Sequence, residues 1–169
     1  RHFEQIADYP GLVSFWWPRF RRIARWMAEE EPGLRQGVTR VIAERNGAIE
    51  LQIGGQPFRL SGRADRIDLM ADGRARIIDY KTGSVPKKKQ VESGFAPQLT
   101  LQAAILARGG FQDVPGRNTA NIAYIHVTGG DPAGEIHMFE LSVMDLASKH
   151  LTALERLLTS YASEMQAYI

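Results

Sequence analysis

The chain contains no cysteine among its 169 residues. This absence excludes disulfide bonds and thiolate metal sites, and it agrees with a reducing cytoplasm, where we expect the protein to work. No apolar stretch approaches the roughly 20 residues that a membrane-spanning helix needs. The sequence also shows no secretory leader, internal repeat or low-complexity tract. We therefore expect an ordinary globular fold with no membrane contact.

An excess of one charge is also missing, since 21 Lys and Arg residues nearly balance 19 Asp and Glu residues and leave a net charge of +2. The pI near 9.1 is by itself weak evidence for polyanionic partners. Two local clusters are more informative: Arg19, Arg21, Arg22 and Arg25, and Lys87, Lys88 and Lys89. Each cluster is consistent with a solvated face or with phosphate contacts, and the sequence leaves both open.

Length and composition predict one domain over residues 1–169. The hydrophobic share of 44% and the charged share of 24% are typical of a globular domain of this size. The first residue is Arg1 rather than Met. We therefore expect the chain to be a fragment of a larger protein.

Helical periodicity predicts an amphipathic helix over about residues 12–30. Bulky apolar residues recur there at helical spacing: Phe15, Phe20, Ile23, Trp26 and Met27. We expect Pro18 in a first turn or at a junction, because a helix interior tolerates proline poorly, and Pro32-Gly33 at the end of the helix. The aromatic side chains are interpreted as core or partner-packing groups, with nucleotide stacking as the less favoured alternative.

Turn residues divide the next segment into a predicted β-meander. The expected turns are Asn46-Gly47, Gly54-Gly55 and Asp72-Gly73, between strands at 38–45, 48–53, 58–70 and 74–81. A polar loop is expected over 82–96. The remaining expected elements are a helix from Pro97 to about Arg108, strands at 121–127 and 135–141, and an amphipathic helix over about 144–165. The pattern predicts an α/β fold with a mixed central sheet between helices.

Two acids and a lysine lie near one end of adjacent predicted strands: Asp65, Asp79 and Lys81. The length of the intervening turn decides which faces they occupy, because a one-residue slip moves a side chain to the opposite face. A two-residue loop at Asp72-Gly73 makes Asp65 and Asp79 point apart. A three-residue loop over 71–73, with Gly73 left-handed, places the two acids opposite each other and separates apolar from charged residues on that face.

In the second register, the Cβ atoms of Asp65 and Asp79 lie about 5 Å apart. Their carboxylates can then chelate one hard cation, Mg²⁺ or Mn²⁺, with the backbone carbonyl of Tyr80 as a further ligand. Such a cation assists phosphodiester hydrolysis, and Lys81 on the same face can orient water and offset phosphate charge. A solvated hairpin edge with no catalytic role is the alternative that spacing alone favours.

At this hairpin the sequence resembles the RecB-like branch of the PD-(D/E)XK nuclease superfamily. The branch pattern is a Gly-x-x-Asp strand, a short turn, and a hydrophobic strand that ends in Asp-Tyr-Lys-Thr/Ser-Gly; residues 62–65 and 79–83 match it. Gln98 lies where the branch has a glutamine motif. The wider sequence is similar to the C-terminal nuclease domain of AddB-type helicase–nuclease proteins of the alphaproteobacterial kind.

The resemblance implies a restriction-endonuclease-like core and a Mg²⁺-dependent exonuclease that processes double-strand breaks for recombinational repair. Asp65 and Asp79 would be metal ligands beside the Tyr80 carbonyl, Lys81 the catalytic lysine, and Gln98 a support for the site or the DNA backbone. Apart from the resemblance, the charge of Lys87, Lys88 and Lys89 makes them the candidates for DNA phosphate contacts. The implied partners are DNA and an AddA-like helicase–nuclease subunit.

Several residues depart from the branch pattern or stand outside it. The tyrosine expected four residues after Gln98 is replaced by Gln102. The upstream histidine that completes metal coordination has no clear match in His2, so we expect it before Arg1 and expect this fragment alone to be weakly active or inactive. Relatives that hold an iron–sulfur cluster do so through cysteines, which this chain lacks.

Two further acids have structural interpretations. Strand alternation places Asp68 on the face opposite the site, where we expect it to pair with Arg66 or Arg76. Glu44, before Asn46-Gly47, is interpreted as an exposed residue near a turn, with metal binding as the less favoured alternative. Two rival functions remain: a nuclease-like domain that only binds DNA or a helicase partner, and a free-standing RecB-like exonuclease.

Overall fold

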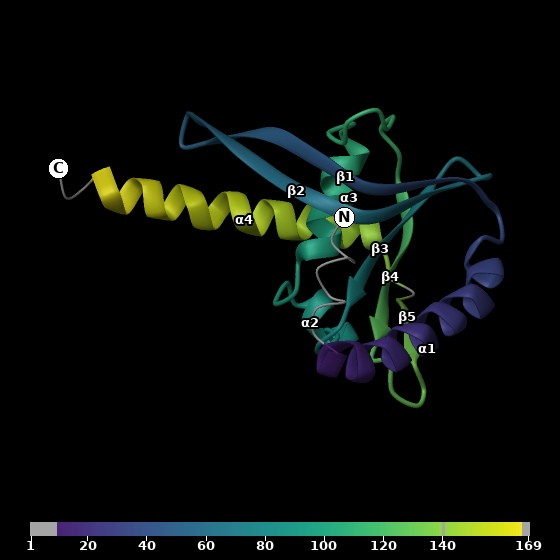
Figure 1. The fold of residues 1–169 in the computed structure, drawn as a ribbon. Helices are drawn as coiled ribbons and strands as arrows, with labels where there is room; N and C mark the ends of the chain where they lie inside the picture. The colour runs from purple at the N-terminus through teal and green to yellow at the C-terminus, as the bar shows by residue number, and fades with distance from the viewer. Residues whose placement is uncertain (1–9, 140, 167–169) are drawn as a thin grey trace. The chain divides into compact units, whose positions relative to one another are not determined.

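The computed structural model describes residues 10–139 and 141–166, with side chains from 14 to 139 and from 141 to 164. His2 lies outside the described residues. The helices and strands follow one another in this order (Figure 1): α1 (Pro10–Leu34), β1 (Val38–Ile53), β2 (Gln56–Met70), β3 (Ala75–Lys81), α2 (Lys88–Glu92), α3 (Gln98–Ala107), β4 (Thr119–Val127), β5 (Gly134–Phe139) and α4 (Val143–Gln166). None of the described helices is long and apolar enough to cross a membrane.

The strands form one mixed five-stranded sheet in the order β1-β2-β3-β4-β5, flanked by helices. The α/β class predicted from the sequence is therefore confirmed. β1, β2 and β3 form an antiparallel meander. The chain passes from β3 to β4 through α2 and α3, which is the kind of long connection that parallel neighbouring strands require.

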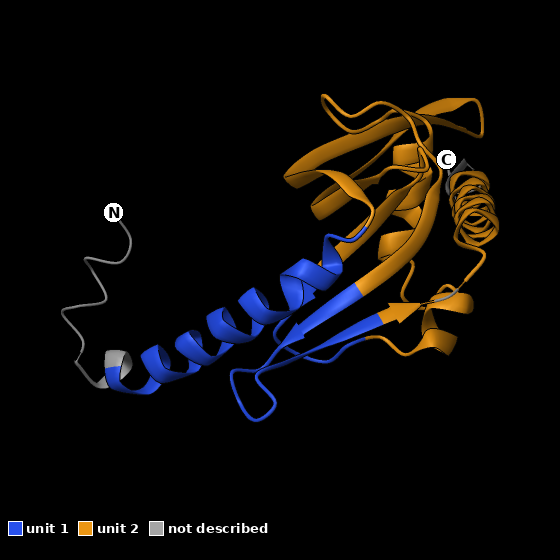
Figure 2. Cartoon of the chain, turned by 90° about the vertical axis from the view of Figure 1, so that its right-hand side faces the viewer, with its two compact units in different colours: residues 1–36, 80–85, 124–137 blue, residues 37–79, 86–123, 138–169 orange. Residues whose placement is uncertain are grey.

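The chain divides into two compact units (Figure 2). Unit 1 contains residues 1–36, 80–85 and 124–137, and unit 2 contains residues 37–79, 86–123 and 138–169. β3, β4 and β5 each continue from one unit into the other along the chain. That both units belong to one nuclease domain stays a prediction.

The core of unit 2 lies between its strands and α3. Ile67 of β2, Ile77 of β3 and Leu99 and Leu106 of α3 are fully buried. Burying a side chain of this size stabilises a fold by about 1.5–3 kcal/mol. Every residue of β3 from Ala75 to Asp79 is buried, including the charged residues Arg76 and Asp79.

The expected turn at Asn46-Gly47 is wrong. β1 continues through these residues, which pair with Arg63 and Gly62 of β2. Gly47 is required here for a different reason: a Cβ atom at this position would lie 2.5 Å from the ring of Phe111. Glycine at position 47 therefore leaves room for the ring of Phe111, which comes from a distant segment of the chain. The turn expected at Gly54-Gly55 is confirmed, since both residues have positive φ between β1 and β2.

Helix α1 differs from its prediction in length and in exposure. Pro18 lies inside the helix rather than in its first turn or at a junction, and Pro32 lies in its last turn. The core alternative is wrong for Phe15 and Phe20, which are 60% and 49% exposed, whereas the partner-packing alternative stays a prediction. The neighbouring Trp16 and Trp17 are 57% and 48% exposed. Arg19 lies over the rings of Phe15 and Trp16.

The segment expected as a polar loop over 82–96 contains the short helix α2. Its first turn is capped by side-chain chemistry that the sequence pattern did not reveal. The backbone N–H of Lys87 donates to Oε1 of Gln90 at 2.8 Å, and Val91 of the same helix is fully buried. A glutamine at this position can satisfy a backbone donor at the helix start.

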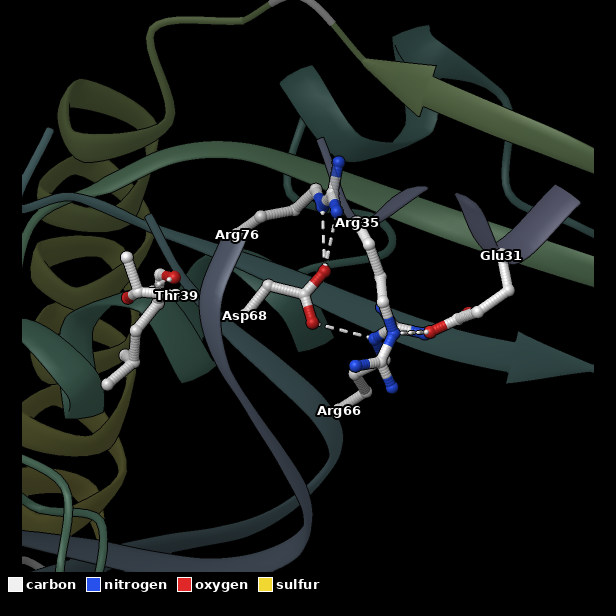
Figure 3. A network of polar contacts seen from close by, with 7 residues as sticks. Glu31, Arg35, Thr39, Arg66, Asp68 and Arg76 are labelled. Carbon is white, nitrogen blue, oxygen red and sulfur yellow. Dashed lines mark hydrogen bonds and ion pairs between the residues drawn. The ribbon is translucent and has the colours of Figure 1, made fainter. Parts of the chain in front are cut away.

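Asp68 has the structural role predicted for it (Figure 3). Its side chain is fully buried and accepts hydrogen bonds from both expected partners. Arg66 Nε donates to Asp68 Oδ1 at 2.7 Å, and Arg76 Nη2 donates to Asp68 Oδ2 at 2.5 Å. A buried carboxylate is costly unless it is paired and hydrogen-bonded in this way. The three residues therefore link β2 to β3.

Candidate active site

The bend between β2 and β3 has three residues, so the second of the two registers is confirmed. The backbone N–H of Met70 donates to Arg74 O at 2.9 Å, and the N–H of Gly73 donates to Met70 O at 3.1 Å. Gly73 has φ +85°, a conformation that glycine adopts without steric cost. The pairs beyond the bend run from Leu69↔Ala75 to Arg66↔Ile78.

An aspartate in the bend reinforces this geometry. Asp72 Oδ1 accepts a hydrogen bond from the backbone N–H of Arg74 at 2.9 Å, and Asp72 Oδ2 accepts one from Arg74 Nε at 2.8 Å. These hydrogen bonds favour the ionised carboxylate, so they hold the pKa of Asp72 below its ordinary value of 3.8. The same ion pair raises the pKa of the Arg74 guanidinium.

Continuing the β2–β3 register by one pair places Asp65 opposite Asp79, both in unit 2. Asp79 is only 4% exposed, whereas Asp65 is half-buried. Opposed residues on antiparallel strands have Cβ atoms about 4.5–5.5 Å apart. That the two carboxylates selected from the sequence meet stays a prediction, which the observed register supports.

Gln98 meets the buried aspartate. Its side-chain Nε2 donates a hydrogen bond to Asp79 Oδ1 at 2.7 Å. Gln98 is the first residue of α3, directly after the N-cap residue Pro97. The structure thus places the predicted supporting residue beside the predicted metal ligand.

Gln102, one turn further along α3, makes a contact that sequence reasoning missed. Its Nε2 donates to the backbone carbonyl of Arg63 at 3.0 Å, and its side chain is buried. Arg63 lies on β2 two residues before Asp65. The residue that replaces the expected tyrosine therefore holds the strand that presents Asp65. No periodicity or spacing rule identifies a side-chain contact to a backbone carbonyl 39 residues away.

Glu44 is exposed, as predicted, but it lies inside β1 rather than near a turn. Its carboxylate forms an ion pair with Arg63 at 2.7 Å, with 71% of the glutamate side chain exposed. Its φ of +49° is unusual for a residue other than glycine. The flanking pairs Ala43↔Arg66 and Arg45↔Ala64 place Glu44 opposite Asp65.

Lys81 is the last residue of β3 and belongs to unit 1. Its Nζ atom lies 5.9 Å from the ring centroid of Tyr124, a buried residue of the same unit, in a cation–π arrangement. Alternation along β3 gives Lys81 and Asp79 the same side of the strand. The side chain of Tyr80, between them, is 37% exposed.

The lysines predicted to bind DNA are exposed, with Lys87 at the N-cap of α2 and Lys88 and Lys89 in its first turn. They belong to unit 2, like the two aspartates. A solvated face and a phosphate-binding face both require exposed lysines, so their exposure does not distinguish the two interpretations.

The oxygen atoms near Asp65 and Asp79 fit a hard divalent cation. The set contains two carboxylates, with the Tyr80 carbonyl adjacent to Asp79 along the chain. Mg²⁺ is usually bound in proteins by one or two carboxylates together with water and phosphate oxygens. The burial of Asp79 and its hydrogen bond from Gln98 fix one carboxylate in position, which a metal-binding site requires.

A family profile of the PD-(D/E)XK nuclease superfamily matches residues 3–168. The chain belongs to this superfamily. The strand–turn–strand motif of this PD-(D/E)XK chain, with its two aspartates and its lysine, is therefore part of a match over almost the whole sequence rather than an isolated resemblance. Superfamily membership makes it a nuclease-like domain.

Proteins similar to this PD-(D/E)XK domain include much longer chains. It is 32% identical over 140 residues to an uncharacterized protein of Rickettsia bellii, covering 75% of this chain and 17% of that protein. It is 28% identical over 150 residues to the uncharacterized protein RC0550 of Rickettsia conorii, covering 75% and 18% respectively. The chain thus spans less than a fifth of the length of these relatives.

A shorter match involves a named protein. The chain is 38% identical over 78 residues to an ATP-dependent helicase/deoxyribonuclease subunit of Streptococcus equi subsp. zooepidemicus, covering 46% of this chain and 7% of that protein. Among solved structures, the crystal structure of SSO0001 has a TM-score of 0.40 and 17% identity, covering 77% of this chain and 58% of that chain. Similarity at that level does not decide a fold.

Proposed function

We propose that this domain hydrolyses phosphodiester bonds of DNA as an exonuclease that uses Mg²⁺ or Mn²⁺. The observation that supports the proposal best is the three-residue bend, because continuing its register by one pair would set Asp65 opposite Asp79. Asp65, Asp79 and the Tyr80 carbonyl would hold the cation, and Lys81 would complete the catalytic set.

Each residue of the set has a distinct task. A divalent cation supplies charge neutralisation and makes water a better nucleophile near neutral pH. Asp65 and Asp79 supply the negative charge that retains the cation, and Gln98 fixes the rotamer of Asp79. Lys81 would orient the attacking water and offset the charge that develops on the phosphate. Direct attack by water on phosphorus needs no covalent intermediate with the protein.

We further propose that the domain works within a helicase–nuclease complex that processes double-strand breaks for recombinational repair. Two features support this assignment: the AddB-like motif around residues 62–83 and the match to a helicase/deoxyribonuclease subunit. In such a complex a partner helicase of the AddA kind feeds single-stranded DNA to the site. A protein that processes DNA in such a complex would be located in the cytoplasm.

Cleavage of end-labelled DNA by the full-length protein tests the proposal, with the 169-residue chain assayed beside it. In Mg²⁺, Asp79→Asn should reduce cleavage by about 10²-fold or more. Asp113→Asn is a matched control, because Asp113 is exposed and has φ +57°, which asparagine tolerates. If the wild type and Asp79→Asn cleave DNA equally, the assignment of the active site is wrong.

The two rival functions give different results in this cleavage assay and in a copurification experiment. A domain that only binds DNA would retain DNA without degrading it in Mg²⁺ or Mn²⁺, and Asp79→Asn would not alter the outcome. A free-standing exonuclease would degrade DNA without copurifying with a helicase subunit. Copurification together with metal-dependent cleavage is the result that the proposal requires.

A further inference from the structure

We infer that His126, Glu135 and His137 form a second metal site, which takes a first-row transition ion such as Zn²⁺. His126 belongs to β4, and the other two residues belong to β5. One ligand atom from each residue lies within 4.8 Å of the other two. All three residues lie in unit 1, whereas Asp65 and Asp79 lie in unit 2. The inference does not depend on the proposed nuclease function.

The hairpin between β4 and β5 explains why the three side chains meet. The backbone N–H of Thr128 donates to Ala133 O at 2.9 Å across the turn. Continuing the pairing of Thr128 with Ala133 by two residues places His126 opposite Glu135. His137, two residues beyond Glu135, extends from the same face of β5. Opposed and neighbouring side chains on one sheet face are within reach of each other.

The turn of this hairpin is held by its own hydrogen bonds. Thr128 Oγ1 donates to Pro132 O at 2.9 Å, and the backbone N–H of Gly130 donates to Thr128 Oγ1 at 3.0 Å. These contacts fix the loop between the strands. The register of His126 against Glu135 is therefore determined without any bound ion.

Helix α1 secures the same hairpin from within unit 1. Arg19 Nη2 donates to Thr128 O at 3.2 Å, and Arg22 Nε donates to Gly129 O at 2.8 Å. The ring of Trp26 lies so close to Gly134 that a Cβ atom there would overlap it. The backbone next to Glu135 is thus fixed by packing. Ligands on secured strands can be held in one geometry more accurately than ligands on loops.

The chemistry of the donors selects the class of ion. Two imidazoles and one carboxylate, with a fourth position open to solvent, form a common Zn²⁺ ligand set. Imidazole nitrogen suits Zn²⁺, Cu²⁺, Ni²⁺ and Fe²⁺, whereas Mg²⁺ prefers oxygen ligands. The cluster therefore differs in selectivity from the carboxylate pair on the β2–β3 hairpin.

The distances fit a tetrahedral site after small side-chain movements. Bonds of 2.0–2.1 Å at tetrahedral angles place two ligand atoms about 3.4 Å apart. His137 Nε2 and Glu135 Oε2 are 3.2 Å apart, and the remaining separations do not exceed 4.8 Å. The glutamate side chain is 64% exposed and the His137 side chain 30% exposed. An ion can reach the cluster, and the glutamate has room to adjust its rotamer.

The alternative is an exposed His–Glu ion pair with no metal, which contributes little to stability. Isothermal titration of the metal-free 169-residue chain with Zn²⁺ separates the two. We expect one Zn²⁺ per chain, and a dissociation constant raised by about 10-fold or more in His126→Ala, His137→Ala and Glu135→Gln. Glu50→Gln, at an exposed strand position, is the matched control and should bind as wild type does.

Two further measurements make the outcome decisive. Zn²⁺ should raise the melting temperature of the wild type and of Glu50→Gln by more than that of Glu135→Gln, whose exposed position leaves folding intact. The double variant Asp65→Asn/Asp79→Asn should keep the Zn²⁺ stoichiometry, which separates this site from the proposed nuclease centre. Zn²⁺ binding that is absent, or that is unaffected by all three cluster variants, overturns the inference.

Discussion

The side-chain amide of Gln98 donates a hydrogen bond to the buried carboxylate of Asp79, with 2.7 Å between Nε2 and Oδ1. This contact joins the first residue of α3 to the end of β3, so a helix defines the rotamer of the proposed metal ligand. A hydrogen bond to a charged group contributes about 1.5–3 kcal/mol. In the apolar surroundings of β3 it also helps to offset the burial of a carboxylate.

Removing this amide should weaken metal binding more than it weakens the fold. Residues that orient a metal ligand typically change metal affinity by about 10–100-fold when mutated. We expect Gln98→Ala to raise the Mn²⁺ dissociation constant within this range. Titration calorimetry with Mn²⁺ measures this effect.

The control for this experiment is Gln112→Ala. Gln112 is an exposed glutamine that donates a hydrogen bond through its backbone N–H, which alanine retains. Its variant should bind Mn²⁺ as the wild type does. If Gln98→Ala also left the Mn²⁺ affinity unchanged, Gln98 would have no part in positioning Asp79.

The ion cluster around Asp68 predicts a large loss of stability that is unrelated to metal binding. Asp68→Asn leaves two buried guanidinium groups, those of Arg66 and Arg76, without their carboxylate partner. Removing one member of a buried ion pair costs about 3–5 kcal/mol. We expect Asp68→Asn to lower the free energy of unfolding by this amount, as measured by urea denaturation.

Asp113→Asn provides the comparison, because it makes the same chemical change at an exposed position. Surface substitutions of this kind are usually within about 0.5 kcal/mol of the wild type. Similar unfolding energies for Asp68→Asn and Asp113→Asn would show that the buried cluster does not stabilise the hairpin.

The register of the β2–β3 hairpin could be predicted from the sequence because it depends on local features. A glycine that accepts positive φ and the alternation of side chains along the two strands determine this register, and the pairing of Asp65 with Asp79 is its extension. Nothing beyond residues 65–79 is needed for this inference. The same locality explains why the pairing of Asp68 with arginine was predictable.

The features that the sequence did not reveal depend on distant contacts. Asn46-Gly47 has the chemistry of a hairpin turn, but Gly47 serves to admit Phe111, which the sequence could not place there. The cluster of His126, Glu135 and His137 forms only when β4 pairs with β5. Its available signal was the Glu-x-His alternation, with a histidine on the preceding strand.

Charge on α2 provides a test of DNA contact. If Lys87, Lys88 and Lys89 meet phosphates of a single strand, replacing all three with alanine should reduce the slope of log K against log salt by up to about 2. The matched control replaces three exposed arginines and removes the same charge: Arg59, Arg108 and Arg156. Fluorescence anisotropy over a range of salt concentrations measures the slope. An equal change in both triple variants would assign the lysines to a solvated face.

The bend at residues 71–73 has a measurable pH signature. Because hydrogen bonds from Arg74 lower the pKa of Asp72 in the folded protein, the ionised carboxylate stabilises the fold at pH values above the unfolded-state pKa. That contribution should be lost as the pH falls through the lower, folded-state pKa. NMR titration of the carboxyl carbon should show the lowered pKa in the wild type. Arg74→Ala should return it toward 3.8.

The same variant tests whether the ion pair between Asp72 and Arg74 stabilises the bend. The stability difference between wild type and Arg74→Ala should be present at neutral pH and should disappear in acid, since protonated Asp72 no longer attracts the guanidinium. Gly73→Ala acts on the same bend through its φ of +85°, which is unfavourable for alanine at any pH. We therefore expect its destabilisation to persist in acid. A pH-independent difference for Arg74→Ala would show that the ion pair with Asp72 does not hold the bend.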